Sequence, residues 1–196
     1  MILEQGFELV GQMMIGLPGS SIESEEKTAK FIIESGATAA RIYPTVVFRD
    51  TELCDMQIHG DYEALSEEDA IIRSAKVLKM FRDAGVSVIR IGLCASENLS
   101  DKSSYYSGPN HPALGELVEN EYYYNKIIEY VDKYKINPGS YLTVAVSPGS
   151  LSKAIGQSKR NKLRLISNLK PKYLQFVEDK SLPEHAVDVR IGERNH

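Results

Sequence analysis

The sequence contains few side chains of the kinds that catalyse reactions or bind metals. Its two cysteines, Cys54 and Cys94, form neither a CxxC pair nor a Cys/His spacing, so nothing supports a structural zinc site or a disulfide framework. His111 lies at the entry of an expected helix, where it could act as a general base but where capping or packing explains it better. His59 and His185 lie alone in expected loops and receive no role. We therefore predict no catalytic residue and no metal ligand in this chain.

A run of basic side chains near the C-terminal end is the clearest binding candidate. From Ser152 to Val177 there are seven basic residues and no Asp or Glu, a composition that suits contact with phosphate groups. The element order expected there is β-α-α-β, with the break Gly156-Gln157-Ser158-Lys159 between the two helices. This order resembles a KH module, in which a G-x-x-G turn binds the nucleic-acid backbone. Lys159 replaces the second glycine, which blocks the close backbone approach but leaves a charge that can contact phosphate.

Two interpretations of this basic segment stay open. The first is RNA binding, and its candidate residues are Lys153, Lys159, Arg160, Lys162 and Arg164. The second is a solvated basic face that docks onto the acidic part of the chain.

Charge and composition divide the chain and limit its class. Residues 1–132 carry a net charge of -11 and residues 133–196 a net charge of +7, which places a boundary near Lys133 to Gly139. With 196 residues, 42% of them apolar, and a mean hydropathy of -0.26, the chain can fill one large or two small cores and is not intrinsically disordered. No stretch approaches the roughly 20 apolar residues of a membrane helix. No signal peptide is evident, so we expect a soluble, cytoplasmic protein without membrane contact.

Apolar runs of strand length alternate with amphipathic helices in the first half. Two capping boxes, Ser20 with Glu23 and Ser66 with Asp69, are expected to open the helices. A long loop is expected between Pro44 and the second box. The alternation predicts parallel βα units, with strands at 7–17, 39–43 and 86–93 and helices at 20–35 and 67–84.

The second half begins with a long helix and continues as a small mixed module. The helix is expected from Pro112 to about Lys135, and the rings of Tyr122, Tyr123 and Tyr124 inside it favour packing over a stacking platform for bases. The module is expected to have strands at 141–147 and 173–177, helices at 150–155 and 160–169, and a weak last strand at 186–191.

The motifs, taken in order, resemble the late barrel strands of radical SAM enzymes. They are QMMIGLPG at 12–19, ARIYPT at 40–45, TEL at 51–53, GDY at 60–62 and VIRIGL at 88–93, followed by GPNHPA at 108–113 and ELVE at 116–119. The branch they resemble most contains the oxygen-independent coproporphyrinogen III oxidase-like proteins and the catalytic subunit of Elongator. The similarity covers roughly residues 5–125.

The resemblance implies an α/β fold class. The expected architecture is a partial (βα) radical SAM-type barrel, late strands only, followed by a long helix and a small basic α+β, KH-like module. The expected domains are residues 1–110 for the barrel strands, 111–136 for the connecting helix and 137–196 for the module.

The resemblance also implies cofactors that this chain cannot hold by itself. Radical SAM enzymes bind a [4Fe-4S] cluster through three thiolates of a CxxxCxxC motif, and S-adenosylmethionine at the open iron. Two separated cysteines cannot supply that motif. We therefore expect the C-terminal part of an oxidoreductase or RNA-modifying transferase, inactive and without a cofactor when alone. The alternative is a non-enzymatic RNA-binding or interaction module.

Carried over residue by residue, the resemblance implies two groups of site residues. Gln12, Met14 and Gly16 would lie near the nucleoside of S-adenosylmethionine, and Arg41 and Tyr43 near the substrate. The alternative, with Met14 in a core and Arg41 in a salt bridge, stays open. The expected partners are the missing N-terminal half of the barrel, or a second copy that pairs with the open edge of the first strand.

Overall fold

In the computed structural model, residues 5–93 and 104–192 are described, and the chain divides into two compact units, residues 1–118 and 119–196. The boundary falls within one helix, α5 (Leu114–Lys133). Among the described residues, no helix is both long and apolar enough to cross a membrane. The α/β fold class is confirmed, whereas the partial barrel and the KH-like module stay predictions.

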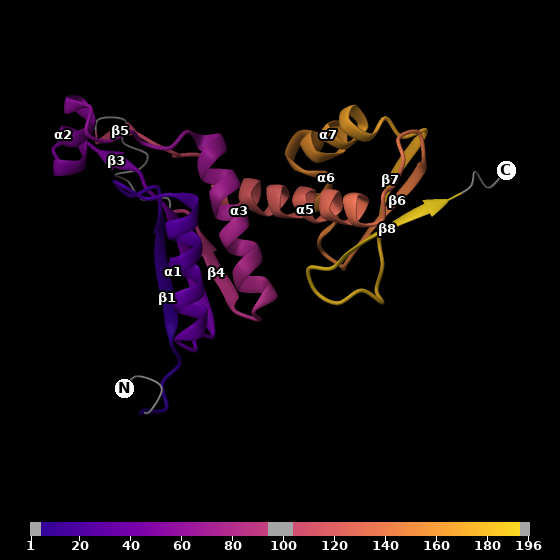
Figure 1. Cartoon of the computed structure of the whole chain (residues 1–196), viewed down its shortest axis with the longest axis horizontal. Coiled ribbons are helices and arrows are strands. Elements are labelled where there is room, and N and C mark those ends of the chain that lie inside the picture. Colours follow the sequence, from indigo (N-terminus) through magenta and orange to yellow (C-terminus); the bar gives the residue numbers. More distant parts are fainter. Residues whose placement is uncertain (1–4, 94–103, 193–196) are drawn as a thin grey trace. The chain divides into compact units, whose positions relative to one another are not determined.

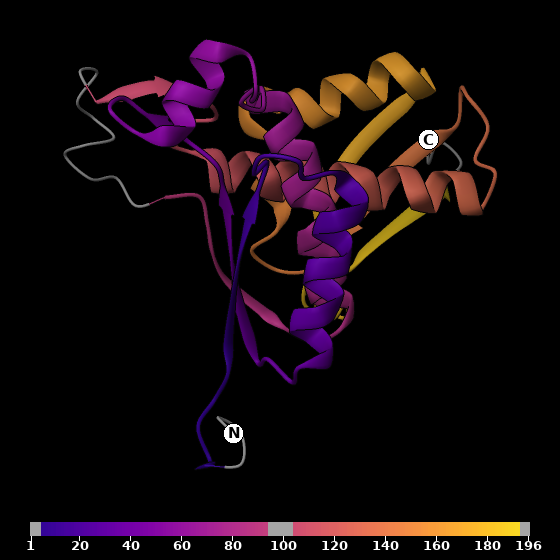
Figure 2. The ribbon, with the colours of Figure 1, turned by 60° about the vertical axis from the view of Figure 1, so that its left-hand side comes forward.

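The first unit is built on a parallel sheet of three strands with the order β1-β2-β4 (Figure 1). These strands are β1 (Val10–Ile15), β2 (Ala39–Pro44) and β4 (Ser87–Ile91). Two crossover helices, α1 (Ile22–Glu34) and α3 (Glu67–Asp83), connect them and pack side by side on the sheet (Figure 2). The predicted strands and helices of this part are therefore confirmed.

The two capping boxes have different outcomes. Ser66 caps α3 as predicted, because its side chain accepts a hydrogen bond from the Asp69 amide. The other prediction was wrong by one residue, since the N-cap of α1 is Ser21, in a reciprocal box with Ser24. Ser20 instead belongs to the preceding turn, where its hydroxyl accepts a hydrogen bond from the Arg73 guanidinium.

The prediction of a long loop after β2 was also wrong, because part of that segment forms a strand and a helix. It contains β3 (Val47–Phe48), which pairs with β5 (Tyr105–Ser107) in an antiparallel ladder, and α2 (Glu52–His59). Thr51 caps α2 at its start, and Gly60, with a φ of 83°, ends it. The helix was missed because it is short and only Cys54 in it is buried, so it carries almost no apolar periodicity.

The second unit contains a three-stranded mixed sheet with the order β7-β6-β8. The central strand β6 (Tyr141–Val146) pairs in parallel with β7 (Tyr173–Glu178) and antiparallel with β8 (Val187–Gly192). The connection from β6 to β7 consists of α6 (Leu151–Ile155), the 3-10 turn η2 (Gln157–Lys159) and α7 (Arg160–Leu169). The predicted element order β-α-α-β is thus confirmed. All three consecutive tyrosines of α5 are buried, as packing requires.

Candidate functional site on the open face of the first sheet

The sheet of the first unit buries only one of its two faces. Along β1, Met13 and Ile15 are buried toward the helices, whereas Val10 and Met14 are 43% and 42% exposed. Parallel sheets are normally covered on both faces, because crossover helices or a barrel interior enclose them. The face that α1 and α3 leave uncovered is therefore the unusual feature of this unit, and we call it the open face.

The structure brings four of the residues singled out in the sequence together on the open face. Gln12 lies opposite Arg41 in the parallel register, and Met14 lies opposite Tyr43. Side chains paired in register point to the same side of a sheet. Arg41 also lies opposite Arg90 of β4, next to an irregularity in the pairing of these two strands, so two exposed arginines lie on neighbouring strands.

The structure does not place Met14 in a core or Arg41 in a salt bridge with another described residue. Met14 is not a core residue, because 42% of its surface is exposed. Arg41 is exposed and, within residues 5–93 and 104–192, forms no salt bridge. Both side chains are therefore available to whatever covers the open face, although their functional roles stay predictions.

Gly16 lies at the end of β1, where the chain turns toward α1. Unlike the other four residues it is buried, and both of its backbone groups are engaged by side chains. Its amide donates a hydrogen bond of 2.7 Å to Glu25 Oε1, and its carbonyl accepts one of 2.7 Å from the Tyr62 hydroxyl. Thr45, at the end of β2, donates both its amide and its hydroxyl to the carbonyl of Ile15, each at 2.8 Å. The end of β1 is thus held by groups from three other segments.

An ion pair between α1 and α3 lies next to this turn. Glu25 on α1 is 3% exposed, and Arg73 on α3 reaches it with two hydrogen bonds, from Nη2 to Oε1 at 2.6 Å and from Nε to Oε2 at 2.8 Å. Sequence reasoning missed both residues. The available signal was a carboxylate on the sheet-facing stripe of α1, in line with Ala29 and Ile32 at helical spacing.

A pocket of about 260 Å³ lies at the carboxyl ends of β2 and β4. Its wall includes Pro44, Ile91 and His111. His111 Nδ1 accepts a hydrogen bond of 3.1 Å from the Ala113 amide, at the start of α5. This contact lies in the turn before the first residue of α5, and whether His111 has the capping or packing role expected from the sequence stays a prediction.

The donor atoms of this chain do not fit an iron-sulfur cluster. Within the described residues, no three His, Cys, Asp or Glu side chains are arranged to hold a metal. Cys54 is buried in a small apolar core with Val47 and Tyr62, and Cys94 lies outside the described residues. Since the whole sequence has two cysteines, three thiolates cannot come from it.

The predicted nucleic-acid residues of the second unit fall into two groups. Lys153 and Arg164 are held by acidic side chains of α5, through a 3.5 Å ion pair with Glu119 and a two-bonded pair with Glu121. Arg164 also lies over the Tyr124 ring, with 3.5 Å from its central carbon to the ring centroid. Burial and Glu121 act in opposite directions on the pKa of Arg164, and the net result is a raised pKa.

The other residues of that set lie toward solvent. Lys159 and Arg160 are exposed, and Lys162 is half-buried. On α7 the apolar residues Leu163 and Ile166 are 59% and 42% exposed, and the exposed residues Lys159 and Lys170 are the N-cap and C-cap of the same helix. We call these four residues, Lys159, Leu163, Ile166 and Lys170, the α7 stripe.

Comparison with known proteins gives partial matches. Residues 37–124 match the Radical_SAM C-terminal domain family. The chain is 35% identical over 68 residues to an uncharacterised protein of Methanocaldococcus jannaschii, an alignment that covers 35% of this chain and 21% of that protein. It is 34% identical over 74 residues to the tRNA uridine(34) acetyltransferases of Methanocaldococcus jannaschii and Methanocaldococcus infernus, covering 36% of this chain and 14% of each relative.

The matched segments therefore span between 14% and 21% of the length of these relatives. They support the resemblance to the radical SAM superfamily. None of the three carries the name of a coproporphyrinogen oxidase, so that branch gains no support from them.

Proposed function

We propose that β1, β2 and β4 are late strands of a radical SAM-type barrel and that the open face is its inner wall. The observation that carries this proposal is the unequal covering of the sheet. Helices cover one face, and the other presents Gln12, Arg41 and Tyr43 in register on adjacent strands. In a βα barrel the helices lie outside and the opposite faces of the strands line the interior, where ligands bind near the carboxyl ends.

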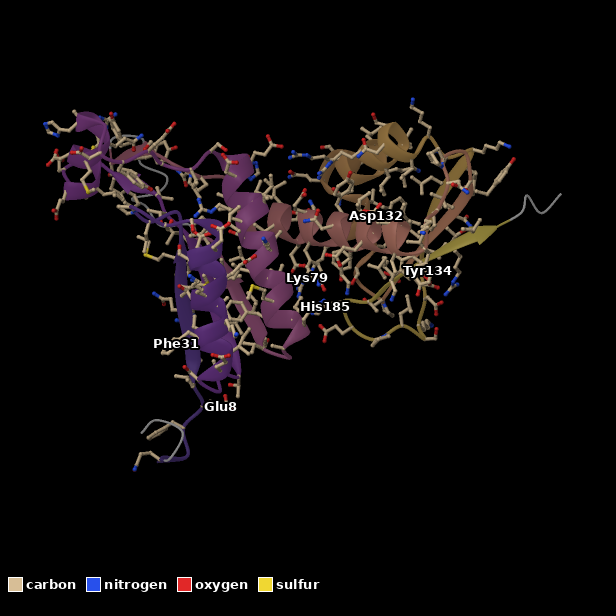
Figure 3. All side chains as sticks on the ribbon, viewed as in Figure 1. Glu8, Phe31, Lys79, Asp132, Tyr134 and His185 are labelled. Atoms are coloured by element: carbon tan, nitrogen blue, oxygen red, sulfur yellow. The ribbon has the colours of Figure 1, made fainter. Side chains whose placement is uncertain are left out.

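The flank of α1 beside the free edge of β1 supports a further βα unit there. On one side of α1, Glu26 contacts Lys76 of α3. Phe31 lies about 140° further round the helix axis, on the flank away from α3. It is 71% exposed, and Figure 3 marks its position on α1. A helix of a neighbouring βα unit would cover this ring, and the strand of that unit would pair with β1.

In this proposal the open face supplies binding groups and the cluster comes from elsewhere. The cluster with S-adenosylmethionine supplies one-electron cleavage of the sulfonium bond, and its three thiolates belong to a segment outside this sequence. Gln12 and Met14 offer an amide and an apolar surface to the nucleoside, while Gly16 contributes shape, since its amide is already engaged. Arg41 and Tyr43 offer a cation and a phenol to an anionic or polar substrate.

The finer assignment that we favour is an RNA-modifying enzyme. Two relatives carry the name tRNA uridine(34) acetyltransferase, although each is matched over only 14% of its length. The coproporphyrinogen oxidase-like alternative rests on the sequence motifs alone.

The test uses this chain together with the proposed segment that carries the three thiolates, reconstituted anaerobically with iron and sulfide. With S-adenosylmethionine and dithionite, we expect formation of 5′-deoxyadenosine, slowed about tenfold or more by Gln12→Ala through lost binding and positioning. The matched control is Lys30→Ala, which changes an exposed residue of α1 that pairs with Glu34 at the surface. Absence of cleavage in the reconstituted protein, or equal rates for the two variants, would contradict the proposal.

The free edge can be tested in the chain itself. An unpaired strand edge beside an exposed Phe31 should associate with a second copy at tens of micromolar. Phe31→Glu should shift light scattering toward the monomer, and Ile58→Glu, at an apolar position of α2 that is 60% exposed, should not. A wild-type chain that stays monomeric, or the same response to both substitutions, would argue against an interaction edge.

A second candidate function is RNA binding by the second unit, and the α7 stripe favours it. Two lysines flank two exposed aliphatic side chains there, and no acidic residue occurs between Ser152 and Val177. Such a surface can contact phosphates with its charges and bases with its apolar centre.

Binding of single-stranded RNA to the full chain, measured against salt, tests this candidate. Each lysine that contacts a phosphate should add about 0.7 to the slope of log K against log salt. Lys159→Glu should weaken binding and reduce that slope, whereas Lys27→Glu on α1 should do neither. Binding that is unaffected by Lys159→Glu would remove the support that the stripe provides.

A further inference from the structure

Both polar backbone groups of Gly16 are held by side chains from outside the strand. The acceptor of its amide, Glu25, is 3% exposed, and the donor to its carbonyl, Tyr62, is 9% exposed. These two residues lie 9 and 46 positions away in the sequence. Water therefore has little access to either bond, and opening one of them leaves a buried polar group without a partner.

Arg73 connects the two ends of the turn that follows. Its guanidinium holds the Glu25 carboxylate through two hydrogen bonds, and its Nη2 also donates to the Ser20 hydroxyl at 3.2 Å. One carboxylate thus binds Gly16 at the start of the turn, and one guanidinium binds Ser20 at its end. We call Glu25, Arg73 and Tyr62 the turn clamp.

The base and the tip of the turn between these anchors differ in how closely they are packed. Gly16 has a φ of +82°, and a Cβ there would lie 2.6 Å from Leu65 Cδ1. At Gly19 a Cβ would meet no described atom within 4 Å. The base is therefore packed, while Leu17, Pro18 and Gly19 are exposed at the carboxyl end of β1.

We infer that Glu25, Arg73 and Tyr62 are positioning residues, which hold the turn at residues 16–20 in one conformation so that its exposed tip is preorganised for a ligand. The ligand-facing part of this inference rests on the proposed function, in which the carboxyl end of β1 faces the barrel interior. A buried ion pair is often no more stabilising than apolar residues of similar size. Its two additional contacts, to Gly16 and to Ser20, are what an apolar pair could not supply.

Amide hydrogen exchange in the chain itself tests the clamp independently of any reaction. Tyr62→Phe keeps the ring and removes only the bond to the Gly16 carbonyl, so it should leave the fold intact. We expect exchange of the Gly16 amide, which is bonded to Glu25, to accelerate about tenfold, while amides in α3 keep their wild-type rates. The matched control is Glu26→Gln, which changes a neighbouring carboxylate of α1 that binds Lys76 instead of the turn.

A charge exchange separates positioning from simple stabilisation. Glu25→Arg combined with Arg73→Glu keeps an ion pair between the helices but removes the acceptor of the Gly16 amide. If the clamp positions the turn, this variant regains thermal stability relative to either single change, and its Gly16 amide still exchanges about tenfold faster than in wild type. Exchange within twofold of wild type in both this variant and Tyr62→Phe would overturn the inference. A failure of the proposed function would instead appear only as absent 5′-deoxyadenosine, with the exchange result unchanged.

Discussion

Replacing Arg73 by methionine should destabilise the first unit far more than breaking the neighbouring ion pair between Lys76 and Glu26. The Arg73 and Glu25 side chains are 13% and 4% exposed. Arg73→Met keeps much of the side-chain volume but leaves a buried carboxylate without its cation, a change that costs about 3–5 kcal/mol. Urea unfolding followed by circular dichroism measures the loss as a lower midpoint at unchanged slope.

The molecule supplies a matched control in the pair between Lys76 and Glu26. It joins the same two helices, α1 and α3, but its side chains are 53% and 33% exposed. Lys76→Met should therefore cost less than about 1 kcal/mol. Equal losses for the two substitutions would refute the reasoning, because only the Arg73 substitution leaves a buried carboxylate without its cation.

A double substitution tests the bond to the turn. Arg73→Met with Glu25→Leu replaces the buried ion pair by apolar side chains, which should recover most of the loss. Recovery should stop about 1–3 kcal/mol below wild type, because the Gly16 amide is then buried without an acceptor. Full recovery would mean that this hydrogen bond contributes little.

Two further predictions concern the second unit. The hydrogen bond from Tyr130 to Asp188 raises the pKa of the phenol to about 12. The stability that this bond contributes is present below the ordinary pKa of about 10 and is lost as the pH rises through about 12. Asp188→Asn should return the pKa of the phenol toward 10. Absorbance at 295 nm after a pH jump measures that pKa. Gly156→Ala should lower the thermal midpoint more than Gly139→Ala. Both glycines have a φ of 81°, so the backbone strain of an alanine is similar at the two positions. An added Cβ at position 156 would lie 2.9 Å from the backbone nitrogen of Asn161, whereas one at position 139 would meet no described atom within 4 Å.

Local patterns in the sequence were sufficient for most of the elements. Alternating apolar runs predicted β1, β2 and β4, and the Ser66 box predicted the start of α3, because these signals act within a few residues. The same reasoning failed for α2 and for the pairing of β3 with β5. That pairing joins Val47 to Ser107, and contacts so distant in the chain leave no local pattern.

Register on the open face was partly accessible from the sequence. The resemblance implied that Gln12 and Met14 lie near the nucleoside and Arg41 and Tyr43 near the substrate, and the parallel pairing of β1 with β2 sets the two pairs side by side. That no described element covers this face could not be inferred from β1 or β2, because exposure depends on where the helices pack.

By itself, the sequence determined which segments form strands and helices and where charge accumulates, since hydrophobic period, capping and composition are properties of neighbouring residues. Only the tertiary structure decided what those charges do. Arg164 counts as part of a basic run, yet Glu121, 43 positions earlier, neutralises it, while Glu25 appears as one of several helix acids but holds the turn at Gly16. The physical reason is that burial and partner choice depend on which segments the fold brings within hydrogen-bonding distance, and that distance bears little relation to separation along the chain.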